Sequence, residues 1–207
     1  MTHVLHIIAS PNGSASVSGR LASVFLDELV RVDPSAKIST LSLFDTELPE
    51  FGRAAAEAKF APLLGKQVTR EQSEVWQPIL ECIRQFDQAD KIVVSTPMWN
   101  GSIPYKLKHY LDVIVQPGIS FGYNFDTMQH LGLLKNRPLQ LMFSRSSVLL
   151  GDLSDFQMPY LRYVFDLIGI RDLRVLAACQ TTRRTAEERE AYITSFYQEA
   201  RDAAARF

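Results

Sequence analysis

The sequence predicts an α/β protein with one five-stranded parallel sheet covered by helices on both faces, a three-layer sandwich. Short β-branched apolar runs alternate five times with longer segments whose apolar residues recur at helical spacing. Parallel strands need long crossovers, and helices usually supply them. The chain has 207 residues, 46% of them hydrophobic, so residues 1–207 are expected to form a single domain with a sizeable core.

The first two strands are predicted close to the N-terminus. Residues 3–9 form a short apolar run, and the small-residue loop after it leads into residues 19–32, whose apolar positions have helical spacing. Residues 37–43 alternate in polarity, which is typical of a strand near a sheet edge. Residues 44–69 have no periodic pattern and are predicted as a loop.

The centre of the chain contains the most strand-like run, between two helical segments. A helix is predicted over residues 69–86, with its first threonine as the N-cap, and Pro78 is expected to bend or divide it. Residues 90–97 are predicted as the third strand. Residues 103–115 place their apolar side chains on one helical face, and Pro104 falls in the first turn, where proline removes no hydrogen bond.

An irregular segment precedes the last two strands. Residues 117–135 are rich in aromatic residues and glycine, and we interpret them as an insertion or hairpin outside the main sheet. Residues 137–144 and 172–178 are predicted as the fourth and fifth strands, with a helix over residues 156–169 between them. Residues 185–207 are predicted as one closing helix that begins with a capping box.

The expected strand order, 2-1-3-4-5, suggests where a ligand would bind. In sheets of this kind the site lies beyond the carboxyl ends of the strands, where the strand order reverses, which here is between the first and third strands. The candidate loops are therefore residues 10–18, 97–102 and 144–151.

The loop at residues 10–18 is rich in hydroxyl groups and leads into a helix. Hydroxyls and free N–H groups at a helix N-terminus form an anion site, to which the helix dipole contributes. The loop lacks the glycine pattern of a dinucleotide site and the lysine of a triphosphate loop, so a phosphate monoester fits best. An ordinary capped loop is an equally good interpretation of this segment alone.

The loop at residues 97–102 carries Pro97, Met98, Trp99 and Asn100 where a buried strand stops. A flat heteroaromatic ligand would use backbone N–H donors along one edge, an aromatic wall and a side-chain amide. This stretch supplies all three. From composition alone, packing of Trp99 in the core or at a dimer interface is an equally good interpretation.

Charge and cysteine content restrict the partners and the location. The net charge is -1 and the 22 Lys and Arg residues are scattered, so neither nucleic acid nor an anionic membrane is an expected partner. The chain has no N-terminal targeting pattern and no apolar run near the ~20 residues of a spanning helix, so a cytoplasmic protein is expected. Cys82 and Cys179 are interpreted as reduced structural thiols, and the four dispersed histidines do not indicate a metal site.

The stretch PMWNGSIPYKLKHYLD (residues 97–112) resembles the Pro-Met-Tyr-Asn-Phe signature of the flavodoxin-like, FMN-dependent NADH azoreductase and NAD(P)H quinone reductase family. The likeness extends to a Ser-x-Ser loop at residues 16–18, to GISFGY, to the Ser-Arg start of residues 144–147 and to PYLRYVFDLIGI. It implies a flavodoxin-like fold and a homodimer with one FMN per subunit near the interface. It also implies reduction by NADH or NADPH in a ping-pong cycle, with hydride transfer through flavin N5.

The resemblance also implies positions for the cofactor. The residues expected to hold the FMN phosphate are Ser10, Ser16, Val17 and Ser18. Those expected along the isoalloxazine ring are Pro97, Met98, Trp99, Asn100 and Gly101, with backbone N–H groups near N5 and O4. Those expected near the O2 edge are Ser144, Ser146 and Ser147.

The sequence departs from the family pattern in three ways. Trp99 replaces the usual tyrosine, which keeps an aromatic ring but removes a hydroxyl. Gly101 stands where a large aromatic residue is usual and should widen the acceptor pocket. Ser146 and Ser147 replace two glycines, and serine adopts positive φ only at a cost, so the flavin is expected to sit differently or bind more weakly.

Phe121, Tyr123 and Phe125 alternate with small residues in the predicted insertion. They are candidates for the substrate pocket as caps over it, from the same subunit or its partner. Packing of these rings on their own domain is the slightly favoured alternative.

The expected function is an FMN-dependent NAD(P)H oxidoreductase that reduces quinones or azo and nitroaromatic compounds, with no certain catalytic side chain because the flavin carries the hydride. Two alternatives stay open: a dedicated flavin enzyme of a biosynthetic pathway, and a flavin-binding redox sensor with little turnover. The sequence does not decide between NADH and NADPH.

Overall fold

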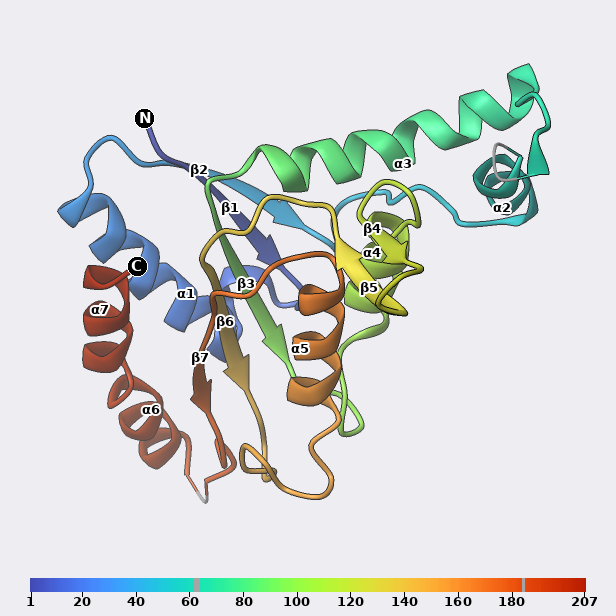
Figure 1. Cartoon of the computed structure of the whole chain (residues 1–207). Coiled ribbons are helices and arrows are strands. Elements are labelled where there is room, and N and C mark those ends of the chain that lie inside the picture. The colour runs from blue at the N-terminus through green and yellow to red at the C-terminus, as the bar shows by residue number, and fades with distance from the viewer. Residues whose placement is uncertain (62–63, 184) are drawn as a thin grey trace.

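A parallel sheet forms the centre of the computed structural model, which describes residues 1–61, 64–183 and 185–207 (Figure 1). The strands of this sheet are β1 (His3–Ile8), β2 (Lys37–Ser42), β3 (Lys91–Pro97), β6 (Leu139–Ser144) and β7 (Leu173–Ala178). They lie in the order β2-β1-β3-β6-β7, and every neighbouring pair is parallel. The prediction of five parallel strands in the order 2-1-3-4-5 is confirmed, with β6 and β7 as its fourth and fifth strands.

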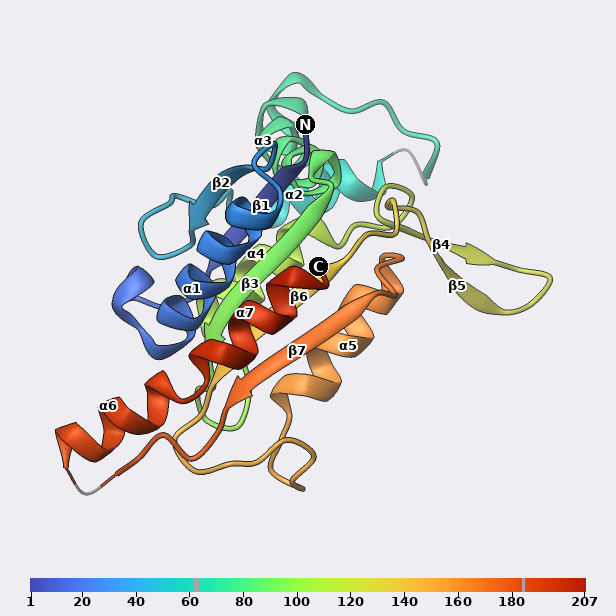
Figure 2. The same ribbon diagram turned by 90° about the vertical axis from the view of Figure 1, so that its left-hand side faces the viewer.

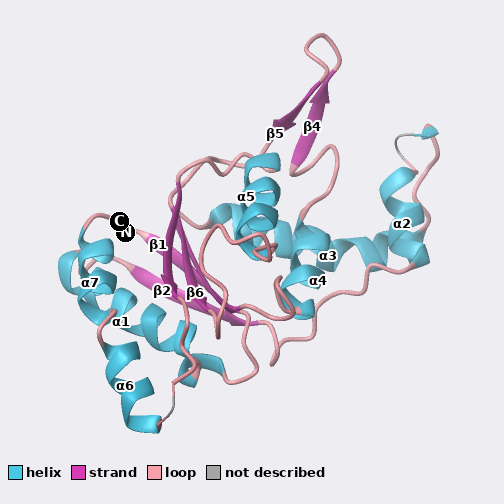
Figure 3. Cartoon of the chain, turned by 90° about the horizontal axis from the view of Figure 1, so that it is seen from below, coloured by secondary structure: helices cyan, strands magenta, loops and turns pink. Residues whose placement is uncertain are grey.

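Helices lie on both faces of the sheet (Figures 1 and 3). The helices are η1 (Gly13–Ala15), α1 (Val17–Val32), α2 (Arg53–Phe60), α3 (Arg70–Gln88), α4 (Tyr105–Ile114), α5 (Gln157–Leu167), α6 (Ala186–Thr194) and α7 (Tyr197–Ala205). Buried residues of α1, α6 and α7 pack on one face of the strands, and those of α3, α4 and α5 pack on the other.

The strand residues alternate between these two cores. Val93 is fully buried in the core that contains Phe25 of α1, whereas its neighbour Val94 is fully buried in the core that contains Phe165 of α5. Successive side chains of a strand point to opposite faces, so a strand covered on both sides reads as a continuous apolar run. Each such buried side chain contributes about 1.5–3 kcal/mol.

A two-stranded hairpin stands away from the main sheet (Figure 2). Its strands are β4 (Phe121–Asn124) and β5 (Gln129–Gly132), which pair in antiparallel register. The N–H of Leu134, just after β5, donates to the carbonyl of Ile168 at the end of α5, with 3.1 Å between the atoms. The hairpin therefore lies where the sequence predicted a segment outside the main sheet, and it is anchored beside the C-terminal end of α5.

Two elements differ from the prediction. Helix α2 lies inside the segment predicted as a loop, of which residues 62–63 lie outside the described residues. The predicted closing helix is divided into α6 and α7 around Ser195 and Phe196. The hydroxyl of Ser195 donates to the carbonyl of Tyr192, and the N–H of Phe196 donates to the carbonyl three residues back, so the helical ladder is interrupted here.

The N-caps predicted at Thr69 and Thr185 are confirmed. Thr69 caps α3 in a capping box with Gln72, and Thr185 caps α6 in a capping box with Glu188. Such reciprocal bonds satisfy backbone N–H groups that have no partner within the helix. Pro78 lies inside α3 without dividing it.

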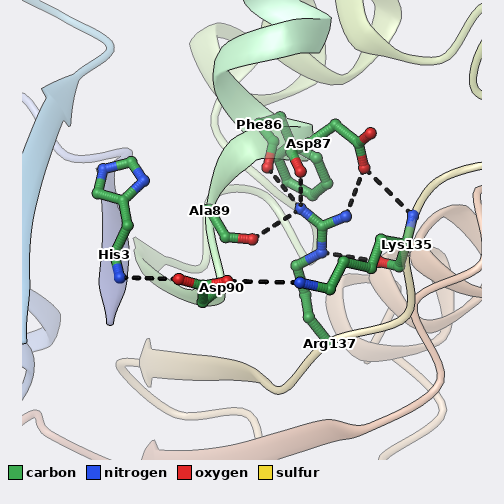
Figure 4. A network of polar contacts seen from close by, with 7 residues as sticks. All are labelled: His3, Phe86, Asp87, Ala89, Asp90, Lys135 and Arg137. Carbon is green, nitrogen blue, oxygen red and sulfur yellow. Dashed lines mark hydrogen bonds and ion pairs between the residues drawn. The ribbon is translucent and has the colours of Figure 1, made fainter. Parts of the chain in front are cut away.

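The C-terminal end of α3 is capped by a buried arginine from another part of the chain (Figure 4). The Arg137 side chain is 1% exposed and donates to the carbonyl oxygens of Phe86, Asp87 and Ala89 at 2.7–2.9 Å. It also pairs with the carboxylate of Asp87. Because helix C-termini carry unsatisfied carbonyls, this guanidinium fixes the point from which β3 starts.

A buried histidine makes the stability of the fold depend on pH. His6 of β1 is buried, with its Nε2 3.0 Å from the hydroxyl of Ser95 on β3, and burial lowers the pKa of its imidazole from 6.5 to about 4. Between these two pH values the His6 imidazole is therefore protonated in the unfolded chain and neutral in the folded chain.

We expect the contribution of His6 to the free energy of unfolding to be constant above pH 6.5. This contribution should decrease as the pH is lowered from 6.5 to about 4. Urea unfolding at several pH values measures this slope. The variant His6→Gln should show a smaller slope in the same window. An equal slope in both proteins would contradict the assignment to His6.

Candidate functional site

The three loops predicted from the sequence meet beyond the carboxyl ends of the central strands, the edge seen from below in Figure 3. They surround a cavity of about 410 Å³, a volume within the ~300–1,000 Å³ typical of small-molecule sites. Its lining consists of Ser10, Pro11, Asn12, Ala15, Ser16, Val17, Arg20, Pro97, Met98, Trp99, Ser144, Arg145, Ser146, Thr181 and Arg189.

Most residues expected at a cofactor are brought together here. Those that line the cavity are Ser10, Ser16, Val17, Pro97, Met98, Trp99, Ser144 and Ser146. Those outside the lining are Ser18, Asn100, Gly101 and Ser147. Ser18 is fully buried, and its hydroxyl lies 3.4 Å from that of Ser16, so it supports the loop from behind.

The N-terminus of α1 forms one end of the cavity. Ser16 caps the helix, because its hydroxyl accepts from the N–H of Gly19 at 3.0 Å and donates to the carbonyl of Gly13 at 2.8 Å. The N–H groups of Val17 and Ser18 come before the first intrahelical bond and make no hydrogen bond within the described part of the chain. These donors, together with the helix dipole, form a cradle for an anion.

Gly19 allows the loop to lie directly on the helix. A Cβ atom at this position would be 2.5 Å from the carbonyl oxygen of Gly13 and 2.8 Å from the Cα of Ser14. Such distances are much shorter than van der Waals contact. The shape of the cradle therefore depends on the absence of a side chain at Gly19.

The loop after β3 is a tight two-residue hairpin. Trp99 and Ser102 exchange two backbone hydrogen bonds of 2.9 Å, and the residues between them, Asn100 and Gly101, both have positive φ, 49° and 78°. These angles fit a type I′ turn, for which Asn-Gly is the preferred sequence. The turn therefore accounts for a glycine at position 101, and a Cβ atom there would lie 3.1 Å from the carbonyl oxygen of Ser154.

The turn also decides which backbone donors are free. The N–H of Met98 donates to the carbonyl of Ser144, and that of Trp99 donates to Ser102, both at 2.9 Å. Those of Asn100 and Gly101 donate to no acceptor within the described residues. The backbone donors available to a ligand at this loop therefore come from the turn.

Trp99 belongs to an aromatic cluster at the wall of the cavity. Its ring packs edge-on against Phe44, with centroids 5.8 Å apart, and Tyr105 lies 6.3 Å away. A second hollow of about 530 Å³ shares Trp99 with the cavity and also includes Asn100 and Tyr160 in its lining. Trp99 thus separates two spaces.

A buried polar network holds two of the loops together. The guanidinium of Arg145 forms a bidentate pair with Asp155 at 2.9 and 3.1 Å, and it also donates to Gln157 Oε1 at 3.1 Å. The amide nitrogen of Gln157 donates in turn to the carbonyl of Pro97 at 2.9 Å. The loop after β6 is therefore fixed relative to the loop after β3.

Ser146 and Ser147 both have negative φ. A serine in place of glycine therefore introduces no left-handed strain at either position. The expectation of a weaker or displaced flavin rested partly on such strain, and the backbone gives it no support on this point.

The hairpin aromatics do not reach this cavity from their own chain. Phe121, Tyr123 and Phe125 are outside its lining, and Phe125 is 80% exposed. Tyr123 packs edge-on against Phe125 and His130 within the hairpin. A role at the site would require a second copy of the chain.

Comparison with known proteins connects this geometry to a family. A family model described as a flavodoxin-like fold matches residues 2–203. An FMN-dependent NADH:quinone oxidoreductase of Pseudomonas syringae pv. tomato is 38% identical over 172 residues, 81% of this chain and 81% of that protein. The chain belongs to this flavodoxin-like family of oxidoreductases. A relative from Desulfotalea psychrophila with the same enzyme name is 32% identical over 198 residues, 94% of this chain and 93% of that protein.

Solved structures of the flavodoxin-like family agree with the fold over its full length. An azoreductase from Bacillus anthracis str. Sterne is 25% identical, with a TM-score of 0.87 and complete coverage of both chains. An FMN-dependent NADH-azoreductase from Bacillus anthracis str. Ames Ancestor, solved in complex with FMN, is 27% identical with a TM-score of 0.85, covering 100% of this chain and 99% of that one.

Several lining residues were not found from the sequence. Arg20, Arg145, Thr181 and Arg189 reach the cavity from α1, from the loop after β6 and from the C-terminal part. In the sequence Arg20 and Arg189 resemble solvated helix charges, and Arg145 stands out only as part of the Ser-Arg likeness to the family. Only the Asn-Gly pair gave a local signal that could have been used, because it predicts a type I′ turn.

Proposed function

We propose that this protein is an FMN-dependent NADH:quinone oxidoreductase, with azo and nitroaromatic compounds as further acceptors. The observation that carries the proposal is that an anion cradle, an aromatic wall and a hydroxyl-rich loop face one cavity. The names of relatives support it, since two are called FMN-dependent NADH:quinone oxidoreductases and a structural neighbour was solved with FMN.

The residues present fit FMN at its phosphate end. Val17 offers a free N–H donor at the start of a 16-residue helix, and the hydroxyls of Ser10 and Ser16 line the same cavity. The lining described here contains three arginines and no carboxylate. This donor set suits a phosphate monoester, which carries about −1.5 to −2 charges at pH 7.

The other end of the cavity suits a flat ring. Met98 and Trp99 supply an apolar and aromatic wall, and the free N–H groups of Asn100 and Gly101 lie on the adjoining turn. Ser144 and Ser146 supply polar groups from the neighbouring loop. In this proposal, these groups orient the edge of the ring.

FMN, when bound, supplies the hydride transfer from the nicotinamide to the acceptor, in the ping-pong order that the resemblance implies. The described lining has no histidine, cysteine or carboxylate. The protein groups of the site therefore bind and orient, and none of these acid or base side chains moves a proton there.

The first test is the cofactor itself. We expect the purified protein to be yellow and to quench FMN fluorescence in a saturable way. When FMN-loaded protein is mixed with NADH in a stopped-flow instrument, we expect the absorbance band of the flavin to bleach rapidly. Steady-state assays over quinones, azo dyes and nitroaromatics then rank the acceptors. A colourless protein without saturable quenching would refute the proposal.

Slow or absent bleaching with NADH would instead favour the redox-sensor alternative. That alternative drew its support from Ser146 and Ser147, whose negative φ removes the expected strain, so we favour the reductase. A narrow acceptor range would favour the dedicated biosynthetic enzyme. NADPH in place of NADH in the same experiment decides the donor.

The assembly and location also remain proposals. We propose a cytoplasmic homodimer whose partner subunit brings Phe121, Tyr123 and Phe125 near the site, and a single domain in which the hairpin is an insertion. No helix among the described residues is long and apolar enough to cross a membrane. Light scattering of the eluted protein measures the oligomeric state, and a monomer would contradict this arrangement.

A further inference from the structure

Three arginines line the cavity, and they differ in how their charges are compensated. Arg145 forms its bidentate pair with Asp155, and both side chains are buried. Arg20 forms a two-pronged ion pair with Glu190 and also donates to the hydroxyl of Tyr197 at 2.7 Å from Nη2. The Glu190 carboxylate first, and then the Tyr197 hydroxyl, raise the pKa of Arg20.

Arg189 is the exception. Within the described residues its guanidinium makes no ion pair and no side-chain hydrogen bond, and it is exposed at the cavity. The neighbouring carboxylates have other partners, since Glu188 accepts from the N–H of Thr185 in the capping box and Glu190 binds Arg20. The pKa of Glu190 is lowered first by Arg20, and Arg189 adds only a minor charge effect.

The same contacts fix where Arg189 lies. The ion pair between Arg20 and Glu190 connects the first turn of α1 with helix α6. Arg189 is the residue before Glu190. Arg189 and Val17 line the same cavity, so this arginine faces the cradle formed by the N-terminus of α1. The cradle itself provides only N–H groups, hydroxyls and about half a positive charge from the helix dipole.

We propose that Arg189 is the residue that recognises the phosphate monoester of the cofactor, and that it makes the cavity selective for FMN over riboflavin. The inference rests on the proposed function, because it requires a flavin in this cavity. A dianionic phosphate matches an uncompensated guanidinium, and charge-assisted bonds of this kind are among the stronger polar interactions. Arg20 is already paired with Glu190, so it acts here as a positioning residue for Arg189.

The test compares two flavins that differ only in the phosphate. Fluorescence quenching gives the Kd of FMN and of riboflavin for the wild-type protein and for Arg189→Gln. We expect the Kd of FMN to rise by about tenfold in the variant while the Kd of riboflavin is unchanged. The difference should shrink at high salt, because the contact is exposed. Arg189→Lys, which keeps the charge, should retain part of the preference for FMN.

Arg183→Gln is the matched control. Arg183 lies in the same segment, but its guanidinium stacks on the ring of Tyr192 at 3.7 Å and it is outside the lining of the cavity. It should leave both Kd values unchanged. Circular dichroism and thermal melting establish that the variants fold equally well.

The outcomes separate the inference from the function on which it rests. If wild-type protein binds FMN but Arg189→Gln keeps the wild-type ratio of the two Kd values, the role of Arg189 is wrong and the proposed function stands. An effect confined to the KM for NADPH would assign Arg189 to the 2′-phosphate of the dinucleotide and would also overturn the inference. If wild-type protein binds neither flavin, both proposals fail.

Discussion

The variant Asp155→Asn is expected to lower the free energy of unfolding by about 3–5 kcal/mol, because it leaves Arg145 buried without its counter-charge. The two side chains are 0% and 1% exposed, so both charges are shielded from bulk solvent. Domains are typically stable by only about 5–15 kcal/mol, so this is a large share of the total. The pair also supports Gln157 and the carbonyl of Pro97, so FMN affinity should fall as well.

Urea unfolding followed by circular dichroism measures the effect. The control is Glu57→Gln, which removes one partner of the exposed Arg53–Glu57 pair and should cost no more than about 0.5 kcal/mol. Equal losses of unfolding free energy in the two variants would show that the buried Arg145–Asp155 pair stabilises the protein no more than an exposed pair does.

Acid should act on the same pair. Burial alone would raise the pKa of the Asp155 carboxyl, but the N–H groups of Met158 and Gly151 and the Arg145 guanidinium together hold it below its ordinary value of 3.8. The stability from this carboxylate is therefore present above that value and is lost as the pH falls through the lower folded pKa. This window lies below the one assigned to His6, so the two effects are separable.

The strands were predictable because the sheet is covered on both faces. Val93 and Val94 enter different cores, so their run stays apolar in the sequence. Helix α2 gave no such signal, since its buried residues are only Ala55 and Ala58, and its periodic apolar face is therefore weak. At the break after α6 the local polar signal is the hydroxyl of Ser195, which lies within a strongly helical composition.

The location of the site was predictable for a similar reason, whereas its polar contacts were not. The carboxyl ends of parallel strands lie at one edge, so the strand order alone brings the three loops together. The pairing of Arg145 with Asp155, and of Arg20 with Glu190, exists only in the folded chain, where residues 10 and 170 positions apart meet. For Gly101 the local sequence was the better guide. The two-residue turn explains the glycine, whereas the resemblance to the family suggested that it widens the acceptor pocket.

The variant Gly19→Ala is expected to destabilise the protein by about 1–3 kcal/mol and to weaken FMN binding by about tenfold. Two effects oppose each other at this position. Alanine is favoured over glycine in a helix by about 1 kcal/mol, which predicts a more stable protein. The new Cβ would be 2.5 Å from the carbonyl oxygen of Gly13, a backbone atom that cannot rotate away. We expect the steric effect to prevail, because η1 must move as a unit.

Movement of η1 would disturb the anion cradle in particular, because Ser16 donates to the carbonyl of Gly13. Thermal melting and titration with FMN measure both consequences in the same samples. Gly52→Ala is the matched control, since Gly52 has a φ of -85° and a Cβ there meets no atom within 4 Å. It should leave FMN affinity unchanged. A Gly19→Ala protein that is more stable than wild type and binds FMN equally well would mean that helix propensity outweighs the contact with Gly13, and that the cradle does not depend on it.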